Sequence, residues 1–366
     1  MVELDRSSFR TTIVARDHIA RIVDAVGLDL LMDEMIAHLT VAIEDFDATR
    51  THVRTRDGFH YREPDVGLLE WMPVMHTAQS TTIKVVGYHP SNPTKRSLPT
   101  ILSTISVFDT ATGHMTGLAD GTFLTALRTG AASAIASRVL ARPSSSVIGL
   151  LGCGAQSVTQ LHALLRTFPI EQVLVADADD HNVDTFAARA AEILPPSVEV
   201  KPAPVELMLE TSDIVCTSTS IGIGEGPLFA DLETRPWLHI NAVGSDFPGK
   251  VELPVALLRR SLVVPDVPEQ AIKEGECQQL TADEIGPPLA DVVADPERFY
   301  PAREQLTVFD STGWALGDQV AMQLLLSHAA RLKVGIEMNL EDIGEDPLDP
   351  YHLGREVRHH PSDRRP

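Results

Sequence analysis

A glycine-rich turn between an apolar run and a helix-forming segment is the feature of this sequence that most constrains its fold. The run VIGLL (147–151) is followed by GCGAQS (152–157) and then by VTQLHALLRTF (158–168). In such a turn Gly152 suits the tight bend, and Gly154 lets the backbone approach a pyrophosphate at the helix N-terminus. Ser157 stands where a third glycine usually falls and is small enough for close packing. The turn therefore predicts a dinucleotide site, with Ala155 and Gln156 at the start of the helix.

Asp177 supports this interpretation. It ends the next apolar run, VLVAD, 25 residues after Gly152. A carboxylate at that place accepts hydrogen bonds from the ribose hydroxyls of the cofactor. Neither Ala178 nor Asp179 offers a cation for a 2′-phosphate, so the sequence favours NAD over NADP. The alternative is a glycine turn in an α/β protein that binds no dinucleotide.

Further short, β-branched runs follow at intervals that leave room for crossover helices. They are VEV (198–200), DIVCTST (213–219), HINAVG (239–244) and LVVPD (262–266). Runs of this kind are typical of parallel strands that are buried on both faces. The sequence therefore predicts a doubly wound α/β domain of the Rossmann type over about 135–330.

The N-terminal part has a different pattern of apolar and turn-forming residues. Residues 17–43 have apolar side chains at helical spacing, which predicts one helix. Short β-rich runs separated by Gly, Pro and Asn then extend from about 52 to 120. A segment of strong helix formers, ALRTGAASAIASRVLA (126–141), ends at Arg142-Pro143.

Composition excludes several classes of partner and site. Thirty Lys and Arg against 51 Asp and Glu give a net charge of −21, so nucleic acid and anionic membrane surfaces are disfavoured. Three distant cysteines provide neither a disulfide framework nor a cysteine zinc site, and no metal is expected. Without a secretory leader or a long apolar segment, a cytoplasmic protein is expected. The adjacent histidines in the tail 355–366 are interpreted as a solvated end.

One motif is misleading. Residues 244–250 (GSDFPGK) fit the pattern G-x-x-x-x-G-K of a phosphate-binding loop. Val251 replaces the Ser or Thr that would hold magnesium, and Asp246 would repel phosphate. Pro248 removes one backbone donor. We therefore reject a nucleoside triphosphate site here.

Several stretches together resemble the ornithine cyclodeaminase/μ-crystallin family over about 65–352. They are ALRTGAAS, IGLLGCGAQSVTQLHAL, HINAVGSDFPGKVELP, EGECQQL and VFDSTGWA. The resemblance implies a Rossmann domain (135–330) that binds NAD, and a discontinuous α/β domain (1–134 with 331–366) that binds substrate and pairs two subunits. It also implies a small-molecule diamino acid as substrate. Hydride leaves its α-carbon and returns after the terminal amine has closed a ring and ammonia has departed.

The resemblance also implies a substrate carboxylate site formed by Arg54, Lys84 and Arg128. Cationic side chains are the donors that a carboxylate needs. Arg128 is expected to open a helix, whose dipole would support the anion. The neighbourhood of Arg54 departs from the family in length, so Arg50 or Arg56 is an alternative.

Two carboxylates are implied as catalytic. Asp246 is expected to receive and return the α-amino proton, and Glu70, in LLEWMP, to lie near the substrate amines. Two carboxylates in different surroundings can divide acid and base roles. The alternatives are a turn-stabilising role for Asp246 and an ion pair with Lys84 for Glu70. Family positions around the cofactor fall on Thr100, Thr219, Val243, Lys250 and Ser311.

Within this resemblance, the loop that contains Asp246 and Lys250 looks like that of the cyclodeaminases. Three stretches look closest to enzymes that convert L-lysine into L-pipecolate, namely VTQLHAL, EGECQQL and DPLDPY. An ornithine cyclodeaminase that makes L-proline is the nearest alternative, because the two substrates differ by one methylene, worth about 1–3 kcal/mol. A ketimine reductase, an amino-acid dehydrogenase and a non-enzymatic binding protein of the crystallin type are the others.

Overall fold

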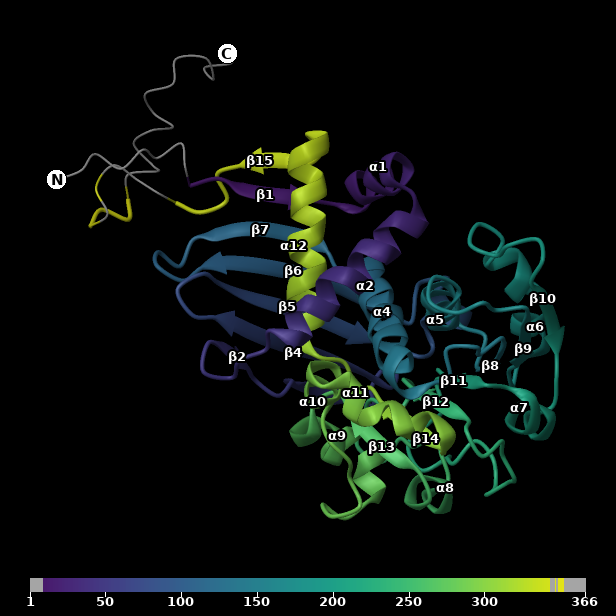
Figure 1. Cartoon of the computed structure of the whole chain (residues 1–366). Coiled ribbons are helices and arrows are strands. Elements are labelled where there is room, and N and C mark those ends of the chain that lie inside the picture. Colours follow the sequence, from purple (N-terminus) through teal and green to yellow (C-terminus); the bar gives the residue numbers. More distant parts are fainter. Residues whose placement is uncertain (1–8, 343–345, 347, 352–366) are drawn as a thin grey trace.

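A computed structural model of the chain describes residues 9–342, 346 and 348–351. It contains two sheets joined by long helices (Figure 1). The tail interpreted as a solvated end, residues 355–366, lies outside the described residues. Within the described part, no helix combines the length and the apolar character needed to cross a membrane.

The second sheet confirms the predicted Rossmann-type α/β fold. Its seven strands are all parallel, in the order β10-β9-β8-β11-β12-β14-β13. Their bounds are β8 (Val147–Leu151), β9 (Gln172–Ala176), β10 (Glu199–Pro202), β11 (Ile214–Thr217), β12 (His239–Ala242), β13 (Leu262–Pro265) and β14 (Thr307–Asp310). Strand order reverses between β8 and β11, which is where ligands bind in such sheets.

Strand β14 is a strand that the sequence analysis did not predict. It has four residues and lies between β12 and β13, although it comes last along the chain. The run TVFD has the β-branched and aromatic residues of a strand, but it is short and leads directly into a Ser-Thr-Gly turn. Its insertion carries Ser311 to the ligand-binding edge of the sheet.

The first sheet has eight strands and is largely antiparallel. Its order is β15-β1-β7-β6-β5-β4-β2, with β3 also paired to β4. Its strands are β1 (Thr11–Val14), β2 (Thr51–Val53), β3 (Asp57–Tyr61), β4 (Gly67–His76), β5 (Ser80–Tyr88), β6 (Ile101–Asp109), β7 (Met115–Asp120) and β15 (Ile336–Met338). Side chains alternate between the faces of a sheet, and Met72 of β4 pairs with Lys84 of β5. Glu70 and Lys84 therefore point to the same face.

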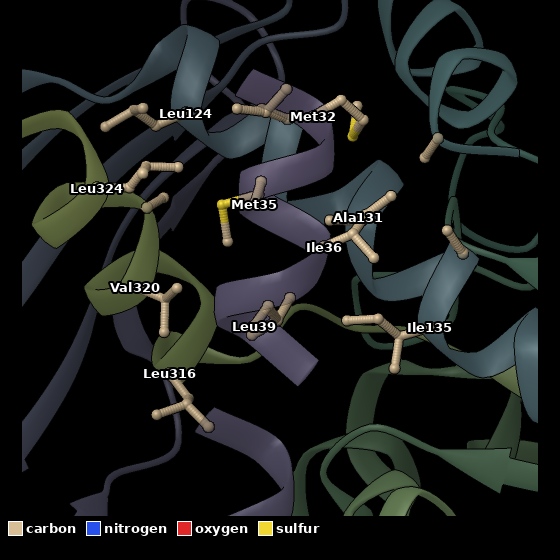
Figure 2. Close-up of a cluster of buried hydrophobic side chains, with 14 of the residues drawn as sticks. Met32, Met35, Ile36, Leu39, Leu124, Ala131, Ile135, Leu316, Val320 and Leu324 are labelled. Atoms are coloured by element: carbon tan, nitrogen blue, oxygen red, sulfur yellow. The ribbon is translucent and has the colours of Figure 1, made fainter. Parts of the chain in front are cut away.

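Three helices lie between the sheets. They are α2 (Leu28–Glu44), α4 (Thr122–Leu140) and α12 (Ala315–Leu332). Figure 2 shows their shared apolar cluster, in which Met35 and Ile36 of α2 lie between Ala131 of α4 and Val320 of α12. The predicted domain boundaries, at 134/135 and 330/331, fall inside α4 and α12.

The single helix predicted over 17–43 is two helices, α1 (Arg16–Val26) and α2. Gly27 separates them with a φ of 87°, which a helix cannot contain. The remaining helices are α3 (Asn92–Arg96), α5 (Ala155–Leu165), α6 (Asp180–Arg189), α7 (Val205–Thr211), α8 (Val255–Arg259), α9 (Pro268–Glu274), α10 (Leu289–Ala294) and α11 (Pro296–Phe299), with 3₁₀ turns at Glu276–Gln279 and Tyr300–Glu304.

Candidate active site

The turn after β8 has the geometry that a dinucleotide needs. Gly152 has a φ of 91°, and a Cβ there would lie 2.8 Å from the carbonyl oxygen of Ser218. Gly154 is the N-cap of α5, and no described atom lies within 4 Å of the place where its Cβ would stand. A pyrophosphate can therefore approach the backbone at the positive end of this helix, and the residues present fit NAD.

Asp177 follows β9 directly and is partly buried beside that turn. Its Oδ2 accepts a hydrogen bond from the backbone N–H of Cys153 at 2.6 Å, and its Oδ1 accepts one from Asp179 at 2.9 Å. Carboxylate oxygens have about four acceptor sites in all, so capacity remains for ribose hydroxyls. Asp179 is engaged as the N-cap of α6.

Asp177→Ala is expected to weaken NAD binding roughly 10- to 100-fold, since hydrogen bonds to charged groups are worth about 1.5–3 kcal/mol. Calorimetric titration with NAD measures this. The matched control is Asp179→Ala, which removes a helix cap and costs about 1 kcal/mol of folding stability. Equal NAD affinity in the wild type and Asp177→Ala would show that this carboxylate does not hold the ribose.

Three of the predicted cofactor residues lie at the carboxyl edge of the second sheet. Thr219 follows β11, Val243 follows β12 and Ser311 follows β14. Buried Glu252 links two of these loops, because it accepts hydrogen bonds from the backbone N–H and hydroxyl of Thr219 at 2.7 Å and from the N–H of Gly244 at 3.0 Å.

Glu252 belongs to a set of buried carboxylates that the sequence analysis missed. Glu276 accepts the backbone N–H groups of Glu252 and Leu253, and Asp310 accepts those of Glu276 and Cys277. Burial raises the pKa of Asp310 to about 7 and that of Glu276 well above its ordinary value. These side chains hold the loops that carry the site. The acidic pair in EGECQQL (Glu274 and Glu276) is the signal that could have indicated Glu276, but that stretch contains neither Glu252 nor Asp310.

Asp246 lies in the loop after β12, and its side chain is 30% exposed. The Nζ of Lys250 lies 3.0 Å from its Oδ1 and 5.1 Å from the ring centroid of Tyr88 at the end of β5. Burial opposes the charge on Lys250, but Asp246, Tyr88 and Glu252 outweigh it and raise its pKa. Thr100 lies at the same end of the first sheet, next to the residue that pairs with Tyr88.

Lys84 and Arg128 converge on one carboxylate. The Nζ of Lys84 and the Nε of Arg128 lie 2.9 and 3.0 Å from Asp318 of α12, and all three side chains are buried. Burial and the nearby Arg128 lower the pKa of Lys84 to about 7. Lys84 therefore pairs with Asp318 and not with Glu70. Two cations share a single anion, which leaves an excess of positive charge for a ligand carboxylate.

The prediction that Arg128 lies at the start of a helix is wrong. Helix α4 begins at Thr122, so Arg128 is its seventh residue and lies in the second turn. The helix dipole acts mainly within the first turn and contributes little here. A lone acid in the apolar segment ALGDQVAMQLLL was the signal for Asp318.

Three arginines, Arg50, Arg54 and Arg56, were considered as ligands of the substrate carboxylate. The structure brings Arg56 into the site. Its Nη2 donates to the carbonyl oxygen of Thr312, and its Nε lies 2.8 Å from the Oε1 of Glu274. Arg54 and Arg50 are exposed, and Arg50 lies in a turn. The guanidinium groups of Arg56 and Arg128 both flank Gly313, where a Cβ would lie within 3.3 Å of them.

Glu70 is enclosed by residues from both parts of the chain. Its Oε1 lies 2.8 Å from the Nε2 of His60 and its Oε2 lies 3.4 Å from the Nη1 of Arg56. Glu274, at the end of α9, completes this acidic group. Burial raises the pKa of Glu274 to about 7, with Glu70 and Asp246 adding to the effect and Arg56 opposing it.

The site thus has a cationic end at Lys84 and Arg128 and an acidic end at Glu70, Glu274 and Asp246. Both lie beside the dinucleotide edge of a Rossmann sheet. Within the described residues, no group of three or more His, Cys, Asp and Glu is placed to hold a metal ion. This combination defines a nucleotide-dependent enzyme that acts on a small zwitterionic substrate.

The chain belongs to the ornithine cyclodeaminase/mu-crystallin family, whose model matches residues 16–331. It is 41% identical to the L-lysine cyclodeaminase of Streptomyces rapamycinicus over 94% of this chain and 100% of the relative. A solved structure of a lysine cyclodeaminase that recognises L-lysine, L-ornithine and L-2,4-diaminobutyric acid matches with a TM-score of 0.91 at 46% identity, covering 94% of this chain and 99% of that one. An archaeal alanine dehydrogenase dimer with bound NAD matches with a TM-score of 0.78 at 28% identity, covering 91% and 100%. These matches confirm the resemblance inferred from the motifs.

Proposed function

We propose that this protein is an NAD-dependent cyclodeaminase that converts L-lysine into L-pipecolate and ammonia. The observation that carries the proposal is a group of three carboxylates, Glu70, Glu274 and Asp246, next to a group of cations, with Arg56 in contact with Glu70 and Glu274 and close to Arg128 at Gly313. An α-amino acid with a second, distant ammonium fits both ends. The similarity to lysine cyclodeaminase over nearly the whole of both chains supports the same substrate.

Each group has a proposed role in this reaction. Lys84, Arg128 and Arg56 bind the substrate carboxylate. Asp246 receives the α-amino proton and later returns it, while Glu70 and Glu274 attract the terminal ammonium. The turn at Gly152 and Gly154 together with Asp177 would hold NAD at the edge of the second sheet, where the cofactor would supply reversible hydride chemistry at the substrate α-carbon. Thr100, Thr219, Val243, Lys250 and Ser311 are proposed to surround the cofactor, and Lys250 also orients Asp246.

Ammonia release from L-lysine with NAD far below the substrate concentration tests the proposal. A cyclodeaminase turns over many substrate molecules per NAD without accumulating NADH, and the product is L-pipecolate. An amino-acid dehydrogenase requires one NAD per turnover, and a binding protein releases no ammonia. L-Ornithine in a parallel assay decides the alternative substrate, because the pocket of the solved lysine cyclodeaminase recognises both.

We expect the reaction with L-lysine to accelerate from mildly acidic to alkaline pH. The attacking amine must be neutral, and its ordinary pKa is about 10.4. Glu274, with a pKa of about 7, becomes an anion above that pH and then attracts the terminal ammonium. Lys84 titrates in the opposite sense: its charge decreases as pH rises through about 7, which raises KM. Separate kcat and KM profiles measure both effects, and a kcat that peaks below neutrality contradicts this account.

We propose a homodimer that pairs through the first sheet. Helix α12 lies over one face of that sheet (Figure 1), and the other face carries apolar side chains. Leu69 and Leu102 are 43% and 44% exposed there, beside Trp71 and Val85. Open faces of antiparallel sheets are ordinarily polar. Leu102→Glu is expected to yield monomers in sedimentation, whereas the exposed control Leu207→Glu on α7 remains dimeric; a dimeric Leu102→Glu variant contradicts this interface.

A further inference from the structure

His60 occupies a place in the site that the proposed roles do not use. It belongs to β3, which pairs with β4 at the edge of the first sheet. Its Nε2 lies 2.8 Å from the Oε1 of Glu70, and its ring centroid lies 4.6 Å from that of Phe247, the residue after Asp246. The imidazole therefore touches both the strand that carries one catalytic carboxylate and the loop that carries the other.

Exposure differs sharply between His60 and its partner. The Glu70 side chain is 3% exposed, whereas the His60 side chain is 43% exposed. Within the part of the chain that the structure describes, the Nδ1 of His60 makes no hydrogen bond. The imidazole thus has one nitrogen on the buried carboxylate and the other open to water.

The proposed reaction requires the site to move protons in both directions. L-Lysine enters with two ammonium groups, and each must lose a proton before hydride can leave the α-carbon and before the terminal amine can attack. One proton later leaves on ammonia, as ammonium, and the other returns to the ring nitrogen of the product. The overall reaction releases no proton, but the site must take up two and give two back.

We propose that His60 conducts protons between Glu70 and solvent during this cycle, an inference that rests on the proposed function. Glu70 takes a proton from a substrate ammonium and passes it to the Nε2 of His60, while the Nδ1 proton leaves to water. The reverse transfer, from water to Nδ1 and from Nε2 to Glu70, supplies the proton that the departing ammonia needs. No bond to carbon changes in these steps and no electrons are transferred. Imidazole suits the task because it changes charge between about pH 5 and 8.

The other charged groups near Glu70 and His60 take part in ion pairs. Arg56 donates to Glu70, Glu274 of α9 pairs with Arg56, and Asp246 pairs with Lys250. Those carboxylates already have cationic partners. His60 is the neighbour of Glu70 that can both accept a proton and reach water, so it acts through Glu70 as a positioning and proton-conducting residue.

Chemical rescue tests this proposal. His60→Ala is expected to lower kcat with L-lysine about 100-fold, at the low end of the range for positioned proton transfer. Free imidazole in the buffer should restore much of the rate, because the ring position is open to solvent. His60→Gln keeps a donor for Glu70 but cannot carry a proton, so it should be as slow as His60→Ala and should not respond to imidazole. His52→Ala, an exposed histidine on β2, is the control and should keep the wild-type rate.

Three results would overturn the proposal: full activity in His60→Ala, full activity in His60→Gln, or a loss in His60→Ala that no imidazole concentration relieves. Absence of ammonia release by the wild type contradicts the proposed function instead.

Discussion

Asp246→Asn should fold and bind NAD but lose cyclodeaminase activity by about 10²–10⁴-fold, the usual contribution of a positioned acid or base. The substitution preserves size and removes the carboxylate that is proposed to accept the proton. It also removes the carboxylate that lies 3.0 Å from Lys250, a side chain that is only 4% exposed. Some loss of thermal stability is therefore expected beside the kinetic effect. Single-turnover rates with L-lysine, at saturating NAD, measure the chemical step directly.

The matched control is Asp231→Asn. Asp231 also pairs with a cation, Arg260, but that pair is exposed and lies away from the site. Exposed pairs contribute about 0–1 kcal/mol to stability, so this variant should resemble the wild type in every assay. Wild-type turnover in Asp246→Asn would exclude Asp246 as the acid and base of the reaction.

Arg56→Gln should reduce kcat/KM for L-lysine roughly 10- to 100-fold, while Arg54→Gln should change it little. The Arg56 guanidinium is proposed to bind the substrate carboxylate, and hydrogen bonds between charged groups are worth about 1.5–3 kcal/mol. Its removal also leaves Glu70 and Glu274 without their shared cation. Breaking a buried pair on one side costs about 3–5 kcal/mol, so the free energy of unfolding should fall as well.

Arg56→Lys separates the two effects. It retains the charge that balances Glu70 and Glu274 but loses the planar fork that binds a carboxylate with two hydrogen bonds. Stability should return toward that of the wild type, whereas KM should stay high. Steady-state kinetics and thermal unfolding of the three variants give the comparison. An Arg54→Gln variant that is as impaired as Arg56→Gln would move the carboxylate site to the other arginine.

The second sheet and its dinucleotide turn could be predicted from the sequence, because local residues specify them. The strand VIGLL, the turn at Gly152 and the helix after it are adjacent in the chain, and each is specified by its own residues. The other parallel strands of the second sheet were predictable for the same reason, because short β-branched runs buried on both faces have a recognisable pattern. Strand β14 (TVFD) is also buried on both faces, but it is four residues long and runs directly into a Ser-Thr-Gly turn, and the sequence analysis did not identify it.

The arrangement of the proposed substrate site could not be predicted from the sequence, because it depends on contacts between residues far apart in the chain. Arg54 and Arg56 are two residues apart, and nothing in their neighbourhood decides which of them turns inward. The choice is made by Glu274 and the turn at Thr312, more than 200 residues away in sequence, which receive the Arg56 guanidinium. Lys84 likewise depends on Asp318, a residue of the helix that returns from the second sheet to the first. A buried charge needs a partner, and sequence patterns specify periodicity and turns but not which distant charge will meet it.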